Sequence, residues 1–353
     1  ATGEIESGYR FGQLALQLVD TFQSSEVRAK TLMAVAYFIY HNKKHFVQAR
    51  TLLPEVYQVG LEHGDFESAG YAAFMAPSYA YFAGKELSAV EQEIAGYAHG
   101  VTQMNNQTAA NYLALYWQCV LNLLENPAEP WMLHGSRYEE NTMLVTHRQA
   151  NDGTALFLYH FHKLLLCVLF QQYEQAIVHA DLAGSYVDSA VGLPPAAIYP
   201  FYDSLARLAG LRPAPRKDTE QDTDTYSPAR SSNRANVPGF NQVSFDAGFL
   251  KKSAFRRVAK NQKKLQRLAK HAPMNYRHKY ILVEAECARI YGRDGDAFLH
   301  YEQAIALAQK HGFVHEEALA HELAARFYLA RGNQDIAATS LRKAHYGYQQ
   351  WGA

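Results

Sequence analysis

The side chains with the widest chemical capability in this 353-residue chain are its 16 histidines. His41 and His45 stand four residues apart, a spacing at which two imidazoles on one helix face can bind zinc. His160 and His162 are two residues apart, so on a helix they point to different faces. We interpret the histidines as scattered over helix surfaces and ends, and we predict no metal site.

Sequence motifs for catalysis are absent as well. The dipeptides His315-Glu316 and His321-Glu322 do not continue into HExxH, because the fifth position is leucine in one and alanine in the other. The chain has no GxxxxGK[ST] phosphate loop, no kinase glycine loop, DFG or HRD sequence, and no GxSxG elbow. We therefore predict no catalytic residue and no cofactor-binding residue, and we expect this chain neither to bind nor to hydrolyse ATP.

The segment from Lys251 to His271 is strongly basic and contains no acidic residue. Phe255, Val258, Leu265 and Leu268 recur at helical spacing, which predicts a docked amphipathic helix. Two interpretations remain open: a basic face that is simply solvated, or a surface that meets an anionic ligand or an acidic partner. Repulsion among so many cations favours a negative neighbour. The candidate partner-binding residues are Lys251, Lys252, Arg256, Arg257, Lys260, Lys263, Lys264, Arg267 and Lys270.

Composition narrows the class of protein. With 34 basic and 34 acidic side chains the net charge is zero, which makes nucleic acid an improbable partner for the chain as a whole. A hydrophobic content of 48% excludes global disorder. Cys119, Cys167 and Cys287 are far apart in apolar runs, which predicts reduced, buried thiols in a cytoplasmic protein. The most apolar stretch, residues 157–170, is too short and too polar to span a bilayer.

Helical periodicity runs through nearly the whole chain, and Gly, Pro, Asn or Asp mark the breaks. The pattern predicts an all-α fold, specifically a right-handed tetratricopeptide-like α-solenoid of antiparallel helix pairs. Small residues at helix crossings allow close approach of the two axes. Two C-terminal copies fill the expected positions, at an offset of 40 residues: Ala285, Ala288, Ala297, Tyr301 and Ala304, then Ala325, Tyr328, Ala337, Leu341 and Ala344.

Weaker copies of the same pattern lie upstream. Ala34 and Tyr37 suggest a degenerate unit. The fuller copies are Ala76, Tyr79, Ser88, Gln92 and Ala95, and then Leu164, Cys167, Ala176, Ala180 and Ala183. The alternative for all copies is that alanine is simply common in helices.

A polar segment divides the array. Between Arg212 and Gly239 the chain is rich in Pro, Ser, Thr, Asp and Arg and has almost no large apolar residue, as in a flexible linker. We therefore predict N-terminal helical repeats over 1–211, a flexible polar insertion over 212–245, and a basic helix with two repeats over 246–353.

Several longer strings carry a resemblance to a known family. They include TGEIESGY at residues 2–9, NQKK at 261–264, HAPMN at 271–275, LVEAE at 282–286, EEALA at 316–320 and ELAA at 322–325. Together they resemble the helical-repeat segment of large bacterial signalling proteins, abundant in cyanobacteria. Those proteins combine a serine/threonine kinase-like domain, a STAND-type AAA ATPase, a GAF domain and a sensor histidine kinase. The resemblance covers nearly the whole chain and is strongest from Asn261 to Ala353.

The resemblance implies a non-catalytic sensor or scaffold that binds a protein, peptide or other ligand and couples it to neighbouring domains. ATP and Mg²⁺ would be needed only in those other domains, and no catalytic residue of the family falls on a position here. Ala1 begins the chain in mid-pattern, which fits a segment of a longer polypeptide. Two alternatives remain: a stand-alone adaptor that binds an acidic partner or nucleic acid through residues 251–270, and a helical-repeat hydrolase or metal-dependent enzyme.

Overall fold

The computed structural model describes residues 4–211 and 247–353, and the predicted insertion over 212–245 lies outside the described residues. Within those residues every regular element is a helix, and the only extended pairing is the isolated bridge between His134 and Glu139. The prediction of an all-α fold is confirmed. No helix in the described part of the chain is long and apolar enough to cross a membrane.

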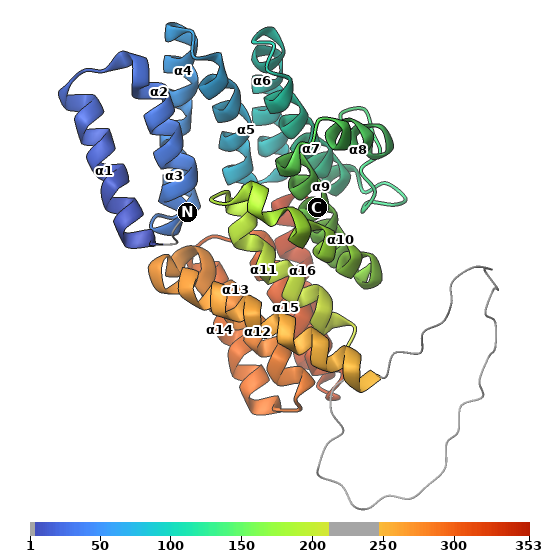
Figure 1. The fold of residues 1–353 in the computed structure, drawn as a ribbon. Helices are drawn as coiled ribbons and strands as arrows, with labels where there is room; N and C mark the ends of the chain where they lie inside the picture. Colours follow the sequence, from blue (N-terminus) through green and yellow to red (C-terminus); the bar gives the residue numbers. More distant parts are fainter. Residues whose placement is uncertain (1–3, 212–246) are drawn as a thin grey trace, which may run out of the picture.

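Up to residue 209 the chain runs through consecutive helices, most of them joined by short turns, with a longer connection over residues 126–139 (Figure 1). They are α1 (Ile5–Thr21), α2 (Ser25–Ala34), α3 (Phe46–Ala49), α4 (Leu53–His63), α5 (Phe66–Phe82), α6 (Leu87–Gln103), α7 (Gln107–Glu125), α8 (Glu140–Gln149), α9 (Gly153–Leu169), α10 (Tyr173–Tyr186) and α11 (Pro194–Ala209). Shorter turns are the π-helix η1 (Val35–Ile39) and the 3₁₀ helices η2 (Tyr40–Asn42), η3 (Arg50–Leu52) and η4 (Val187–Ala190).

The C-terminal helices are α12 (Ala247–His271), α13 (Pro273–Ile290), α14 (Asp294–Lys310), α15 (Val314–Leu329) and α16 (Gln334–Trp351). Asparagine and aspartate side chains begin several helices of the array; Asp152, for example, accepts a hydrogen bond from the Ala155 amide at 2.9 Å. Glycines with positive φ, such as Gly292 at 70° and Gly312 at 73°, reverse the chain between successive C-terminal helices. The short connections make neighbouring helices antiparallel.

The small residues predicted at the C-terminal helix crossings are buried. Ala285, Ala288, Ala297 and Ala325 are fully shielded from solvent, and Ala304, Ala337 and Ala344 are at most 3% exposed. Leu341 contradicts the proposed register, because its side chain is 42% exposed. The crossing between α15 and α16 is therefore made by the alanines, without the large residue expected beside them.

The upstream copies divide into one that is confirmed and one that is partly wrong. Leu164, Cys167, Ala176, Ala180 and Ala183 are all buried between α9 and α10. In α6, by contrast, Ser88, Gln92 and Ala95 are not buried, and Leu87, Val90 and Ile94 make the buried face instead. Ser88 and Ala95 therefore stand at positions of α6 that are not buried, where packing does not select the residue type. Ala34 is half-buried, whereas Tyr37 is fully buried.

The C-terminal helices pack against the N-terminal ones and share one hydrophobic core with them. The indole of Trp351 at the end of α16 lies 6.0 Å from the Tyr81 ring of α5, and His45 bonds the backbone carbonyl of His311 at 3.0 Å. Arg326 of α15 contacts the Tyr173 hydroxyl at the start of α10. The C-terminal helices are therefore held against α5, the turn before α3 and the start of α10.

A cluster of charged side chains is enclosed where α13 meets α15. The Lys279 ammonium lies 2.7 Å from the Glu316 carboxylate, and His278 contacts the same carboxylate. All three side chains are at most 3% exposed. Burial lowers the pKa of Lys279, whereas Lys279 and His278 hold the pKa of Glu316 below its usual range. Removing one partner of such a cluster leaves an uncompensated buried charge.

Two histidines elsewhere in the core are held neutral by burial. His41 and His162 each donate a hydrogen bond from Nδ1 to a backbone carbonyl one turn earlier, at 2.9 and 2.8 Å. Neither side chain is more than 1% exposed. Burial lowers the pKa of each imidazole to about 4. The three cysteines are likewise buried and free, as predicted.

Enlarging an alanine at a helix crossing is expected to destabilise the fold. Ala325→Leu or Ala337→Leu should lower the free energy of unfolding by about 1–3 kcal/mol, because the added methylenes force the two helices apart. Ala95→Leu is the matched control, since Ala95 is exposed on α6. Urea denaturation measures all three. Equal stability of the crossing variants and the control would show that the crossings tolerate the larger side chain.

Stability should also fall on acidification. The histidines of the unfolded chain take up protons near pH 6.5, whereas His41 and His162 resist protonation in the fold until about pH 4. Between these values the unfolded state binds more protons, so each such histidine lowers stability by up to about 1.4 kcal/mol per pH unit as the pH falls. His162→Leu should flatten this dependence in urea titrations from pH 7 to 4.5, while His345→Leu, at an exposed position, should not.

Candidate functional site on helix α12

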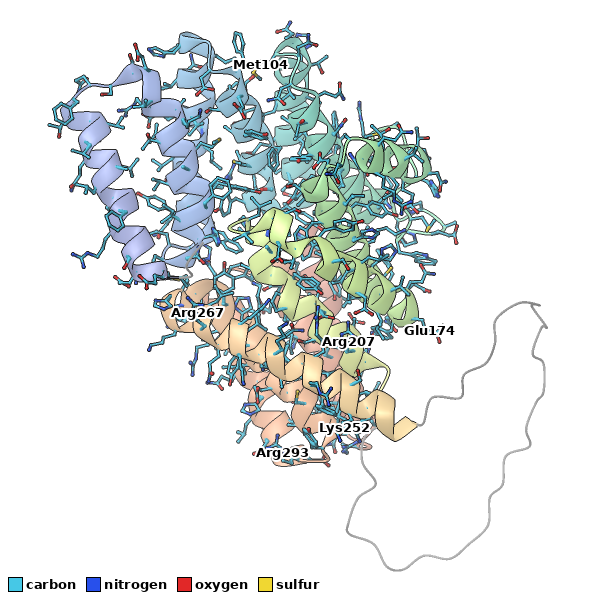
Figure 2. All side chains as sticks on the ribbon, viewed as in Figure 1. Met104, Glu174, Arg207, Lys252, Arg267 and Arg293 are labelled. Atoms are coloured by element: carbon cyan, nitrogen blue, oxygen red, sulfur yellow. The ribbon has the colours of Figure 1, made fainter. Side chains whose placement is uncertain are left out.

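The basic segment forms the 25-residue helix α12, which crosses the surface over α11 and α13 (Figure 2). Its apolar stripe faces inward as predicted: Val258 and Leu265 are buried, and Phe255 and Leu268 are partly buried against the core. Pro273 begins the next helix after a single intervening residue, which ends α12 at His271. Because the apolar stripe packs inward, most of the cations of α12 lie on the opposite, solvent-facing side of the helix.

One buried carboxylate attaches α12 to α11. The side chain of Asp203 is fully buried and accepts hydrogen bonds from Arg207 at 2.6 Å, Arg257 at 2.7 Å and Asn261 at 2.8 Å. Arg257 also donates to the Tyr199 hydroxyl at 2.5 Å. Two arginines and one amide together satisfy a charge that would be costly to bury alone.

The nine predicted cations divide into two groups. Arg257 is engaged with Asp203 and Tyr199, and Lys251 is half-buried. The other seven are exposed: Lys252, Arg256, Lys260, Lys263, Lys264, Arg267 and Lys270. Within the described residues, none of these seven has a carboxylate within ion-pair distance. α12 therefore presents a long exposed surface of unneutralised positive charge, called the basic face below.

Lys264 shows the electrostatic strain in the basic face. Its pKa lies below the usual range, because desolvation and the neighbouring cations Lys260 and Arg257 together outweigh the more distant acids Asp188 and Asp203, which raise it. Repulsion between like charges one turn apart on a helix is destabilising. A bound anion would relieve this repulsion and would stabilise the charged form of the lysine.

A groove runs along the basic face between α12 and α13. At one end a hollow of about 480 Å³ is lined by Lys263, Arg267, Lys270 and Arg277 together with Tyr280, and its lining contains no acid. At the other end a hollow of about 320 Å³ is lined by aromatic and apolar side chains, including Phe255 and Tyr291, with Glu284 and Arg293. Lys263, Gln266 and Tyr280 line both hollows, so the two are continuous.

Gln262 lies buried at the floor of this groove. Its amide nitrogen donates to the Tyr280 carbonyl at 3.0 Å and to Glu284 at 2.6 Å. Its amide oxygen has no hydrogen-bond partner within the described residues, although the side chain is only 8% exposed. Buried polar atoms without a partner are uncommon, and one in the lining of a groove leaves an acceptor for a bound donor.

The histidines singled out in the sequence have other partners in the fold. His41 bonds the Tyr37 carbonyl, whereas His45 bonds the Val47 amide and the His311 carbonyl. His160 faces His179 at 3.0 Å between the two Nδ1 atoms, while His162 packs against Tyr116. No group of three or more potential metal ligands occurs in the described ranges.

Sequence reasoning missed the buried cluster of Lys279, Glu316, His278 and His315. Those residues can exchange protons in principle, but none of them lines the cavities described here. The sequence signal was a charged pair, His278-Lys279, inside an otherwise buried helical pattern, with the partner Glu316 37 residues after Lys279. We interpret the cluster as structural, since its four side chains are at most 6% exposed.

Comparison of the chain with protein-family models, with curated proteins and with solved structures gave no match. The candidate site is therefore defined by its geometry alone. It consists of a basic face without acids and a groove that is cationic at one end and aromatic at the other.

Asp203→Asn should loosen α12 from α11. The amide keeps the shape of the side chain but leaves two arginines without their counter-ion, so we expect a loss of about 2–3 kcal/mol in the free energy of unfolding. Asp181→Asn is the matched control, because Asp181 pairs with the same Arg207 at the surface and should cost at most about 1 kcal/mol. Urea denaturation gives the stabilities, and hydrogen exchange of the α12 amides reports the loosening. Unchanged exchange in Asp203→Asn would show that the apolar stripe alone holds the helix.

Proposed function

We propose that this chain is a non-catalytic helical-repeat module that binds an acidic protein or peptide along the basic face of α12. The observation that carries the proposal is the set of seven exposed cations with no carboxylate within ion-pair distance among the described residues. A surface of this kind attracts an oppositely charged partner and raises the rate of association.

The groove supports a peptide in preference to a nucleic acid. Lys263, Arg267, Lys270 and Arg277 suit a run of acidic residues, whereas Phe255 and Tyr291 at the other end suit an apolar or aromatic side chain. A partner with both features, an acidic run followed by a hydrophobic anchor, matches the groove along its length. A nucleic acid would use the cations but would leave Glu284 facing its phosphates.

The wider role that we propose is that of a sensor or scaffold in a larger signalling protein with kinase-like and ATPase domains. The support is the resemblance of the strings at residues 261–353 and the helical-pair architecture. In such a protein the acidic partner is either a separate polypeptide or a neighbouring domain. Binding would shift the neighbouring ATPase between states by no more than the difference in affinity for those states.

Charge reversal on the basic face tests the proposed function. The variant Lys260→Glu, Lys263→Glu, Lys264→Glu and Arg267→Glu should weaken binding of a fluorescent acidic peptide, eight glutamates followed by Phe-Tyr, by at least about tenfold at low salt. The salt dependence of binding should flatten as well. Thermal stability should change little, because these charged groups are exposed.

The matched control reverses four exposed cations elsewhere, Arg10, Lys30, Lys310 and Lys343, and so makes the same change in net charge. Equal weakening in both variants would mean that net charge alone attracts the peptide, and the proposal would fail. Tighter binding of a single-stranded oligonucleotide than of the peptide by the unmodified chain would assign the surface to nucleic acid instead.

A further inference from the structure

A second cavity lies where the beginning of α1 meets the end of α12. Its volume is about 650 Å³, within the range of roughly 300–1,000 Å³ typical of small-molecule sites. It is open to solvent on one side, and four segments that are far apart in the sequence line it: the start of α1, the η1–η2 turns, the turn before α11 and the last turns of α12. Arg267 marks the α12 side of this junction in Figure 2.

The lining combines an apolar wall with two cations. Ile5, Phe38, Ile39 and Val191 supply apolar surface from three of the segments. α12 contributes Lys264, Arg267 and Leu268, which are three and four residues apart and so lie on one side of the helix. Phe38 and Val191 are 37% and 51% exposed, so both leave apolar surface in the lining of the cavity open to solvent.

Few acids lie near the two cations: Asp188 and Asp203 act on Lys264 from outside the lining of the cavity. Glu4 is the acid in its lining, and it is exposed on the N-terminal side of α1. The next acid along, Glu6, is paired with Lys43 at 2.6 Å. Neither Lys264 nor Arg267 has an ion-pair partner within the described residues.

We propose that this cavity binds a small amphiphilic anion, with a phosphate or carboxylate head against Lys264 and Arg267 and an apolar tail against Phe38, Ile39 and Leu268. Arginine and lysine on one helix face suit a phosphate or carboxylate head, and the apolar wall would exclude water from the tail. The inference does not rest on the proposed function, since it concerns a different cavity and a different class of ligand.

Gly8 provides a way to block the cavity without touching its charges. It lies in α1 and lines the cavity, and a Cβ atom at this position would meet no atom within 4 Å. Gly8→Trp should therefore fill the space and keep the helix. Gly96→Trp is the matched control, because Gly96 is also helical, also has open space at its Cβ and lines none of the cavities described.

The experiment is calorimetric titration with octyl phosphate below its critical micelle concentration. We expect saturable binding with one site per chain, about tenfold or more tighter than binding of octanol, which has the tail without the charge. Gly8→Trp should abolish binding of both, and Gly96→Trp should leave it unchanged. Lys264→Met with Arg267→Met should reduce the affinity for octyl phosphate to that for octanol, even if Gly8→Trp fails to fold.

Three results would overturn the inference: no saturable binding, equal binding of octyl phosphate and octanol, or unchanged binding in both Gly8→Trp and the double methionine variant. Lys263→Glu with Lys270→Glu separates the two proposals, since it alters the groove and leaves this cavity intact. Vesicles containing phosphatidate identify the source of the head group. Vesicle binding that Gly8→Trp abolishes assigns it to a membrane lipid, and binding of the soluble compound alone assigns it to a free amphiphile.

Discussion

The arrangement of the two halves depends on the side-chain amide of Asn275. It accepts a hydrogen bond from the Phe46 amide at 3.2 Å and donates to the carbonyls of His41 and Lys44 at 2.9 and 2.8 Å. The backbone between η2 and α3 has few helical partners for these groups, and Asn275 satisfies them in a fully buried position. One residue, Ala272, separates α13 from α12, so fixing the start of α13 also fixes the last turns of α12. This bears on both the groove and the cavity beside α1, because α12 lines each of them.

The cations of α12 differ in role according to whether they reach a buried acid. Arg257 reaches the enclosed Asp203 and becomes part of the attachment to α11. Lys260, Lys263 and Arg267, within three turns of it, remain exposed and unpaired in the described part of the chain. Removing the first type of charge leaves a buried carboxylate uncompensated, whereas removing the second relieves repulsion. The apolar stripe and Asp203 hold α12 in place despite this repulsion, so the exposed cations of the basic face are not needed to attach the helix.

Local patterns in the sequence predicted the helices, the inward stripe of α12 and the alanines at the C-terminal crossings. These features repeat every three or four residues, so a short window contains the signal. The errors came where packing does not impose one residue type: Leu341 is exposed, and α6 buries Leu87, Val90 and Ile94 in place of Ser88, Gln92 and Ala95. The hydrogen bonds that hold the helices to one another could not be predicted, because their partners are far apart in the sequence. Asn275 and Phe46 are separated by 229 residues, and Arg257 and Asp203 by 54. The cavity beside α1 could not be predicted for the same reason, because its lining comes from four segments that are far apart in the sequence.

Arg267 links the two proposed sites, because it lines both the acid-free end of the groove and the cavity beside α1. An anion held in the cavity would neutralise part of the positive potential that an acidic partner meets in the groove. The two ligands would therefore compete through charge even without overlapping in space, and by linkage each would weaken the other by the same factor. Lys264 adds to the effect, since it lines the cavity and belongs to the basic face. If both proposed sites bind their ligands, Asn275 does more than stabilise the fold: it holds the end of α12, where an anion in the cavity would change the charge that an acidic partner meets on the basic face.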